Sequence, residues 1–157
     1  MRQIRVAAAA FDPAIEAAAL QVGRTDVGAV VSFVGYCRGE AGTLDALELE
    51  HFPGMAEAEM DRIAAEAEGR WPLLGISIVH RHGVVKPGEP IVVVAAASAH
   101  RSAAFAAADF IMDFLKTEAP FWKREHRAQA TADPKAAGSW VAAKAADDAA
   151  RARWREG

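Results

Sequence analysis

Two pairs of apolar segments follow one another along this chain, with only a short loop between the members of each pair. Residues 27–36 precede residues 44–51, and residues 74–82 precede residues 91–97. Short apolar or alternating runs bounded by glycine and proline are typical of β-strands, and strands that follow directly on each other usually form hairpins. The sequence therefore predicts an α+β domain with a mixed, largely antiparallel sheet and flanking helices.

Four segments have the pattern of helices: 13–22, 55–71, 99–116 and 142–156. The third is the most regular, because its alanines and large apolar residues form one stripe, and Pro120 forces it to end by residue 118 or 119. Extended segments at 4–8 and 121–127 complete the predicted order β-α-β-β-α-β-β-α-β-α.

The chain has 157 residues, the length of one domain, which we place at residues 1–141 with a helical tail at 142–157. Its net charge of −3 argues against a general nucleic-acid binder. Cys37 is the only cysteine, so it has no partner for an internal disulfide or a cysteine-based zinc site. No apolar run reaches the length of a membrane span, and Asp12-Pro13 interrupts the first one. We expect a cytoplasmic protein that binds no membrane.

Ser98 precedes the long third helix, and we expect it to cap that helix. The free backbone N–H groups at a helix start attract anions, and His100 and Arg101 add side-chain donors at the same place. The alternative is a capped helix whose histidine and arginine are only solvated.

Lys116 lies at the end of the same helix, and Ala119-Pro120 turns the chain so that Lys123 can return towards it. In an extended segment Lys123 shares one face with Phe121 and Glu125. Two ammonium groups close together among aromatic side chains have two uses. The pKa of one lysine can fall, which makes it a nucleophile, or both lysines stay charged and hold a phosphate. The sequence leaves both open.

Tyr36, Cys37 and Arg38 stand where a buried strand opens into a glycine-containing loop. Arg38 is suited to bind an anion, with a surface arginine as the alternative. A lone thiol at a strand end is usually a small buried apolar group, so we expect Cys37 to be chemically inert.

Three histidines on predicted strands raise the question of a metal site: His51, His80 and His82. No fourth ligand and no established metal-binding spacing accompanies them, so we predict no metal site.

Three stretches of the sequence are distinctive: residues 50–55, 98–105 and 110–125. Together they closely resemble the large, catalytic subunit of molybdopterin synthase. The run Lys-Thr-Glu-Ala-Pro-Phe-Trp-Lys-Arg-Glu at 116–125 is long and specific, and the resemblance continues in order from about the second strand to Trp140.

This resemblance implies the α/β hammerhead fold and a heterotetramer. Two copies of this chain would form a central homodimer, and a small ubiquitin-like subunit would dock at each end. The C-terminal Gly-Gly of that subunit would carry a thiocarboxylate. Two such sulfurs would be transferred to cyclic pyranopterin monophosphate (precursor Z) to form the dithiolene of molybdopterin. No cofactor is implied, because the partner supplies the sulfur.

The functional lysines of the family correspond to Lys116 and Lys123, which we predict to be catalytic. The substrate-binding residues that the resemblance implies are Tyr36, Cys37, Arg38, His100, Arg101, Lys116, Lys123, Arg124 and Glu125. Three features depart from the family. Cys37 stands where an ordinary residue such as valine is usual, which favours an inert thiol. The segment 127–139 looks longer than usual, and a basic residue that follows the tryptophan in some relatives corresponds only weakly to Lys144.

His100 and Lys116 are both expected to face substrate although they sit on one helix. At a rise of 1.5 Å per residue their backbones are about 24 Å apart, whereas a tricyclic pterin with its cyclic phosphate is only about 10 Å long. We therefore expect two copies of the chain to share each active site.

Two other classes of function remain open. The first is a non-catalytic module that binds an anionic nucleotide or pterin through Arg38, His100 and Arg101, without need of two convergent lysines. The second is an enzyme of unrelated fold that forms a Schiff base on a lysine.

Overall fold

A computed structural model of the chain describes residues 1–127, 139–140 and 145–155. Its larger sheet has the strand order β1-β4-β6-β2. The strands are β1 (Arg2–Ala7), β2 (Ala29–Tyr36), β4 (Leu73–Arg81) and β6 (Pro90–Ser98). β1 lies parallel to β4, and the other neighbours are antiparallel. The predicted α+β class and the mixed, largely antiparallel sheet are confirmed.

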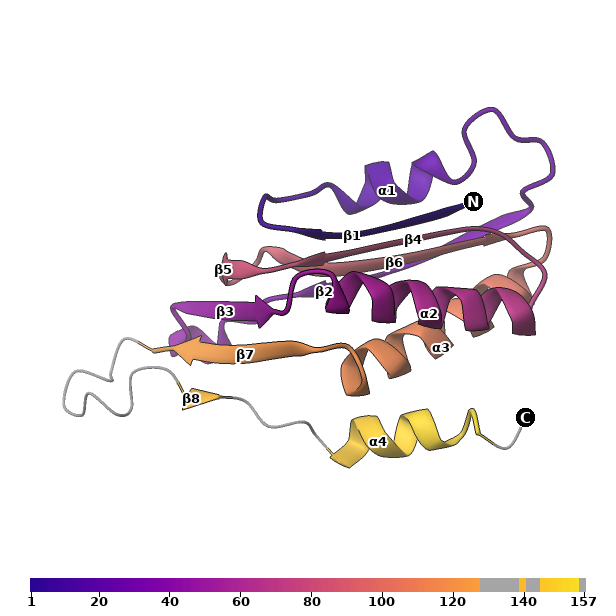
Figure 1. The fold of residues 1–157 in the computed structure, drawn as a ribbon. Helices are drawn as coiled ribbons and strands as arrows, with labels where there is room; N and C mark the ends of the chain where they lie inside the picture. The colour runs from indigo at the N-terminus through magenta and orange to yellow at the C-terminus, as the bar shows by residue number, and fades with distance from the viewer. Residues whose placement is uncertain (128–138, 141–144, 156–157) are drawn as a thin grey trace.

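A second, antiparallel sheet has the order β5-β3-β7-β8 and lies at one end of the first (Figure 1). Its strands are β3 (Ala46–His51), β5 (Gly83–Val85), β7 (Phe121–His126) and β8 (Ser139–Trp140). The apolar pattern of the sequence indicated neither the division of the strands into two sheets nor the short strand β5. Gly83 has a φ of 80°, a conformation that glycine adopts readily. This residue lets the chain leave the first sheet after β4 and enter the second at once.

Helices cover both faces of the larger sheet, with α1 (Pro13–Ala19) on one face and both α2 (Met55–Arg70) and α3 (Arg101–Thr117) on the other (Figure 1). Asp12 caps α1 by accepting a hydrogen bond from the backbone N–H of Ala14 at 2.8 Å. The carboxylate of Glu57 accepts a hydrogen bond from the N–H of Gly54 at 3.0 Å, which secures the start of α2. A single 3-10 turn, η1 (Glu40–Gly42), follows β2.

The main core lies between the larger sheet and the pair α2 and α3, with the fully buried Phe110 among its largest side chains. Successive side chains of β6 point to opposite faces of the larger sheet. Val94 and Ala96 belong to this core. Ala95 and Ala97 face the other side of the sheet, where they pack with Leu20, the residue that follows α1. The small alanines of β6 allow helices to approach the sheet closely on both faces.

The long helix starts later than we predicted. Ser98 does not cap it, because β6 continues through Ser98, which pairs with both neighbouring strands. The cap residue is His100, and the Ser98 hydroxyl accepts a hydrogen bond from the His100 N–H at 3.2 Å. Strand pairing on both sides holds Ser98 in the sheet and moves the helix start to Arg101.

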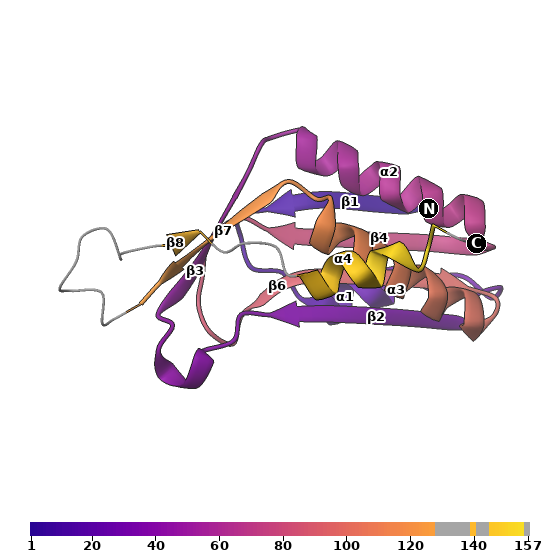
Figure 2. The same ribbon diagram turned by 90° about the horizontal axis from the view of Figure 1, so that it is seen from below.

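The C-terminal helix α4 (Ala145–Ala152) lies along α3 (Figure 2). Trp154, just after it, packs into the main core beside Trp71 and Phe110. The helix predicted at 142–156 is thus described between 145 and 152. Lys144 and most of the segment 127–139 lie outside the described residues. No helix in the described part of the chain has the length and apolar character needed to cross a membrane.

Candidate active site

A cavity of about 480 Å³ opens where β2 and α3 end and β7 begins. Four of the predicted site residues line it: Tyr36, Arg38, Lys116 and Lys123. Aromatic and apolar side chains, including Phe33, Phe121, Ile91 and Leu115, form much of the remaining wall. The structure therefore brings together residues that are up to 87 positions apart in the sequence.

The two lysines line one cavity because the chain reverses between them. Thr117 is the last residue of α3, and the backbone N–H of Phe121 donates to the carbonyl oxygen of Ala119 at 2.8 Å. The chain then enters β7, in which Lys123 lies opposite Leu49 of β3. Pairing with β3 holds β7 extended, so that Phe121 and Lys123 both face the cavity.

The cavity wall is cationic. Arg38, Lys116 and Lys123 contribute positive groups, and the described lining residues include no carboxylate. Glu118 is only two residues from Lys116, but its carboxylate is paired with Arg62 of α2 and Arg151 of α4. These two arginines hold the Glu118 carboxylate in ion pairs outside the cavity. The cavity therefore suits an anionic ligand.

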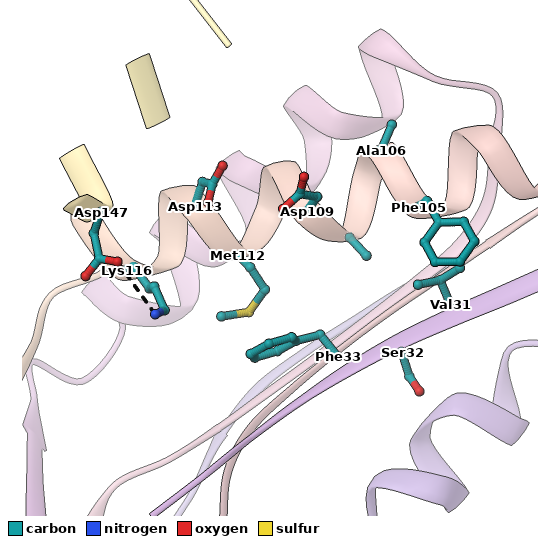
Figure 3. A pocket seen from close by; sticks show the side chains of 11 residues that line it. Val31, Ser32, Phe33, Phe105, Ala106, Asp109, Met112, Asp113, Lys116 and Asp147 are labelled. Carbon is teal, nitrogen blue, oxygen red and sulfur yellow. Dashed lines mark ion pairs between the residues drawn. The ribbon is translucent and has the colours of Figure 1, made fainter. Parts of the chain in front are cut away.

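Lys116 also borders a neighbouring groove of about 560 Å³ between β2 and α3, where Phe33, Phe105 and Met112 form an apolar floor (Figure 3). At the end of this groove Asp147 of α4 lies 3.6 Å from the Lys116 ammonium. Half of the Lys116 side chain is exposed, so the pair is weak and leaves the lysine accessible.

Arg124 and Glu125 do not line the cavity among the residues described for it. The Arg124 guanidinium lies 3.7 Å from Glu48 and 3.9 Å from Glu50, on the neighbouring strand β3. Glu125 accepts a hydrogen bond from Arg127 at 3.0 Å. Within one chain these predicted residues therefore flank the cationic cavity.

His100 and Arg101 line a separate cavity of about 510 Å³ at the start of α3, together with Gly28 and Phe105. Sixteen residues of helix, about 24 Å, separate this point from Lys116. One chain does not bring the two groups of predicted residues together, as the helix rise led us to expect. The shared site between two copies stays a prediction.

The side chain of Cys37 turns away from the cationic cavity. It is 3% exposed and packs with Leu44, Leu49 and Val85 in a small core beneath the second sheet. Burial raises the pKa of the Cys37 thiol. Both features are those of an inert cysteine, and the side chain contributes no surface to the described cavity lining.

Sequence reasoning missed His80 as a cavity residue. It lies on β4, is 7% exposed, and lines the cavity beside Phe121. Its position in an alternating strand gave no signal, since facing the cavity depends on where β7 packs. His51 and His82 have ring centroids 4.6 Å apart. The described residues contain no group of three or more His, Cys, Asp or Glu side chains that could hold a metal ion.

The chain is similar to known proteins over nearly its whole length. The family described as MoaE protein matches residues 6–118. A protein from Mesorhizobium japonicum, named molybdopterin synthase catalytic subunit, is 60% identical over 152 residues, covering 97% of this chain and 92% of its own length.

Solved structures give the same result. A molybdopterin biosynthesis MoaE protein from Burkholderia ambifaria matches with a TM-score of 0.82 and 45% identity, covering 99% of each chain. A molybdopterin synthase from Staphylococcus aureus matches with a TM-score of 0.78 and 27% identity, covering 90% of this chain and 98% of the other.

Proposed function

Because the chain belongs to the MoaE protein family, we infer that it is the catalytic subunit of a molybdopterin synthase. As a sulfurtransferase it moves sulfur from the thiocarboxylated C-terminus of a small ubiquitin-like subunit to precursor Z. Two transfers form the dithiolene of molybdopterin. The observation that carries this proposal is the convergence of Arg38, Lys116 and Lys123 on one cavity.

The cavity matches the chemistry of both reactants. A thiocarboxylate and a cyclic phosphate are anions, and three cationic side chains line the cavity. An extended Gly-Gly tail has no side chains, so it can enter a narrow groove and place its charged end among cations. Gly35 lets Val92 pack closely against β2 in the cavity wall, because a Cβ there would lie 2.8 Å from a methyl group of Val92.

The proposal assigns a role to each of these residues. Lys116 is the principal catalytic residue and Lys123 the second, both meeting the thiocarboxylate carbon or the pterin side chain. Arg38 binds the phosphate, and Tyr36 forms part of the wall. Cys37 takes part only through its backbone between these two residues.

Two of the substrate-binding residues, His100 and Arg101, come from a second copy of the chain. In a two-fold dimer with antiparallel neighbouring α3 helices, the partner's His100 and the partner's Arg101 approach the cationic cavity. Arg124 and Glu125 border it from β7. The proposed sulfur donor is the small subunit. We expect the reaction in the cytoplasm, because the chain has a lone cysteine.

The deciding experiment mixes the purified chain with thiocarboxylated small subunit and precursor Z and measures molybdopterin. Product that depends on all three components supports the proposal. Binding of precursor Z without product would favour the non-catalytic module. Covalent trapping of a carbonyl substrate by borohydride, without sulfur transfer, would favour the Schiff-base enzyme instead.

A further inference from the structure

The imidazole of His80 lines the cavity and is held in a fixed position. Its ring stacks on Phe121 with centroids 3.7 Å apart and an interplanar angle of 16°. Phe121 lies two residues before Lys123 on β7, and both side chains line the same cavity as His80. The stacking therefore holds the imidazole beside one of the proposed catalytic lysines.

The hydrogen bonding of His80 determines its tautomer. Nδ1 lies 2.8 Å from the carbonyl oxygen of Arg81. A carbonyl oxygen only accepts hydrogen bonds, so Nδ1 carries the proton and Nε2 has a free lone pair. Among the described residues, only Arg81 Nε and Arg151 Nε are enclosed without a hydrogen-bond partner. Nε2 of His80 is therefore not sealed in the core.

The surroundings keep this imidazole neutral. Burial is the main cause, and the nearby charge of Lys123 and the ring of His51 act in the same direction, which lowers the pKa of His80 to about 4. Arg38 and Lys116 add positive charge to the same cavity. His80 is thus a neutral base with a defined lone pair among cationic side chains.

The proposed reaction needs such a group. A small subunit that gives up its sulfur must leave as a carboxylate, so its carbonyl carbon must gain an oxygen atom. Water supplies that oxygen when the sulfur already bonded to the pterin is released from the carbonyl carbon. The water must lose a proton as it attacks.

We propose that His80 is the proton acceptor for this water. The inference rests on the proposed function. The water oxygen bonds to the carbonyl carbon of the conjugate between small subunit and pterin, and the carbon–sulfur bond to that carbon breaks. One water proton passes through Nε2 of His80 to the departing thiolate. The second water proton is released as the new carboxylic acid ionises. The step is a hydrolysis, in which no atom is oxidised or reduced.

A neutral base suits this cavity better than an acidic side chain. A carboxylate of similar basicity would repel the thiocarboxylate and the phosphate and would pair with the lysines. An imidazole held neutral has comparable basicity and no negative charge. A neutral imidazole can therefore act as the base in a cavity whose described charged side chains are all cationic.

The test is a single turnover of His80→Gln with thiocarboxylated small subunit and precursor Z, followed by mass spectrometry of the intact small subunit. Glutamine retains hydrogen-bonding groups but takes up no proton. We expect the small subunit–pterin conjugate to accumulate and its breakdown to slow by about 100-fold or more. Added hydroxylamine should restore release as the small subunit's hydroxamate, because this nucleophile needs no such base.

His82→Gln is the matched control, since His82 lies two residues away and is not a described lining residue of the cavity. It should release product at the wild-type rate. Equal conjugate breakdown in His80→Gln and wild type would overturn the proposal, and so would a loss of turnover without any conjugate. A wild-type protein that makes no molybdopterin would instead contradict the proposed function.

A second measurement needs no variant. ¹⁵N spectra of the histidine-labelled wild-type protein should show His80 neutral at pH 6, with Nδ1 protonated and Nε2 bare. The same state should persist when the small subunit binds. A protonated Nε2 would overturn the proposal even if His80→Gln fails to fold.

Discussion

Lys116 lies in the last turn of α3 at the edge of the cationic cavity, where half of its side chain is exposed. Lys116→Ala should lower molybdopterin formation by about 100-fold or more, because a group that acts on the reacting atoms is lost. The melting temperature and the affinity for the small subunit should stay close to wild type. Lys86→Ala, in the exposed turn before β6, serves as the matched control. Near-normal turnover of Lys116→Ala would remove its catalytic assignment.

Cys37 provides the opposite test at the same scale. In the proposed reaction sulfur arrives on the small subunit as a thiocarboxylate, so no persulfide on this chain is needed. Cys37→Ala and Cys37→Val should both retain most activity in the same assay. Because burial raises the pKa of the thiol, wild-type Cys37 should also react slowly with iodoacetamide at pH 7. Loss of sulfur transfer in either folded variant would reverse this interpretation.

The low pKa of His80 has a consequence for stability. The folded protein holds this pKa at about 4, against 6.5 for an ordinary histidine. Above about pH 6.5 the imidazole is neutral in both states, and its contribution to the free energy of unfolding is complete. As the pH falls from 6.5 towards 4, the unfolded chain binds a proton that the folded state excludes, so stability falls.

Urea unfolding between pH 4 and pH 7 measures this effect. Wild type should lose on the order of 3 kcal/mol more than His80→Gln over that interval. Only the difference in pH dependence matters, because the substitution also changes packing. Parallel pH curves for the two proteins would show that His80 does not titrate as the buried structure implies.

At the scale of elements, α4 is secured to α3 by the residues that follow it. The indole N–H of Trp154 donates to Asp113 at 2.7 Å, and Arg153 pairs with Asp109 and Asp113 at 2.7 and 2.8 Å. The indole also meets Phe110 edge-on at 5.6 Å. This docking positions α4, and with it Asp147, beside the Lys116 ammonium.

Trp154→Ala should therefore lower the free energy of unfolding by roughly 2 kcal/mol, less than a fully buried tryptophan because Trp154 is only partly buried. Trp122→Ala is the control, since Trp122 is 49% exposed, and it should change stability by no more than about 0.5 kcal/mol. Chemical denaturation followed by circular dichroism measures both. Equal effects of the two substitutions would mean that α4 is not docked on α3 in solution.

At the scale of the whole molecule, the two cavities that we predict to bind anions lie at opposite ends of α3. If each active site combines the ends of two chains, Lys116→Ala and Arg101→Ala should complement each other. A mixed dimer would contain one site with both wild-type residues and one site with neither. Mixtures of the two inactive variants should regain activity, up to about a quarter of wild type when exchange is random and each intact site works alone.

Subunit exchange must be confirmed independently, for example by native mass spectrometry of differently labelled chains. Mixed dimers that form without any recovery of activity would contradict the shared site. Full activity of unmixed Arg101→Ala would show that the start of α3 takes no part in the reaction.

The sequence alone determined most of the local structure. Proline and aspartate positions predicted the start of α1 and the end of α3, and the period of apolar residues predicted the long helices. The turn at Ala119-Pro120 also predicted that Lys123 would return to Lys116, and the helix rise predicted that His100 would lie far from both. These inferences depend on neighbours within a few residues or on the geometry of one helix, which the order of residues specifies directly.

Only the tertiary structure decided how distant strands pair. It divided the strands between two sheets, kept Ser98 in β6 through pairing on both sides, and placed β7 so that Phe121 stacks on His80. It also buried Cys37 away from the cavity although Tyr36 and Arg38 line it. Strand pairing and side-chain burial depend on contacts between segments that are far apart in the chain. The free energies of such contacts cannot be predicted from a local sequence pattern.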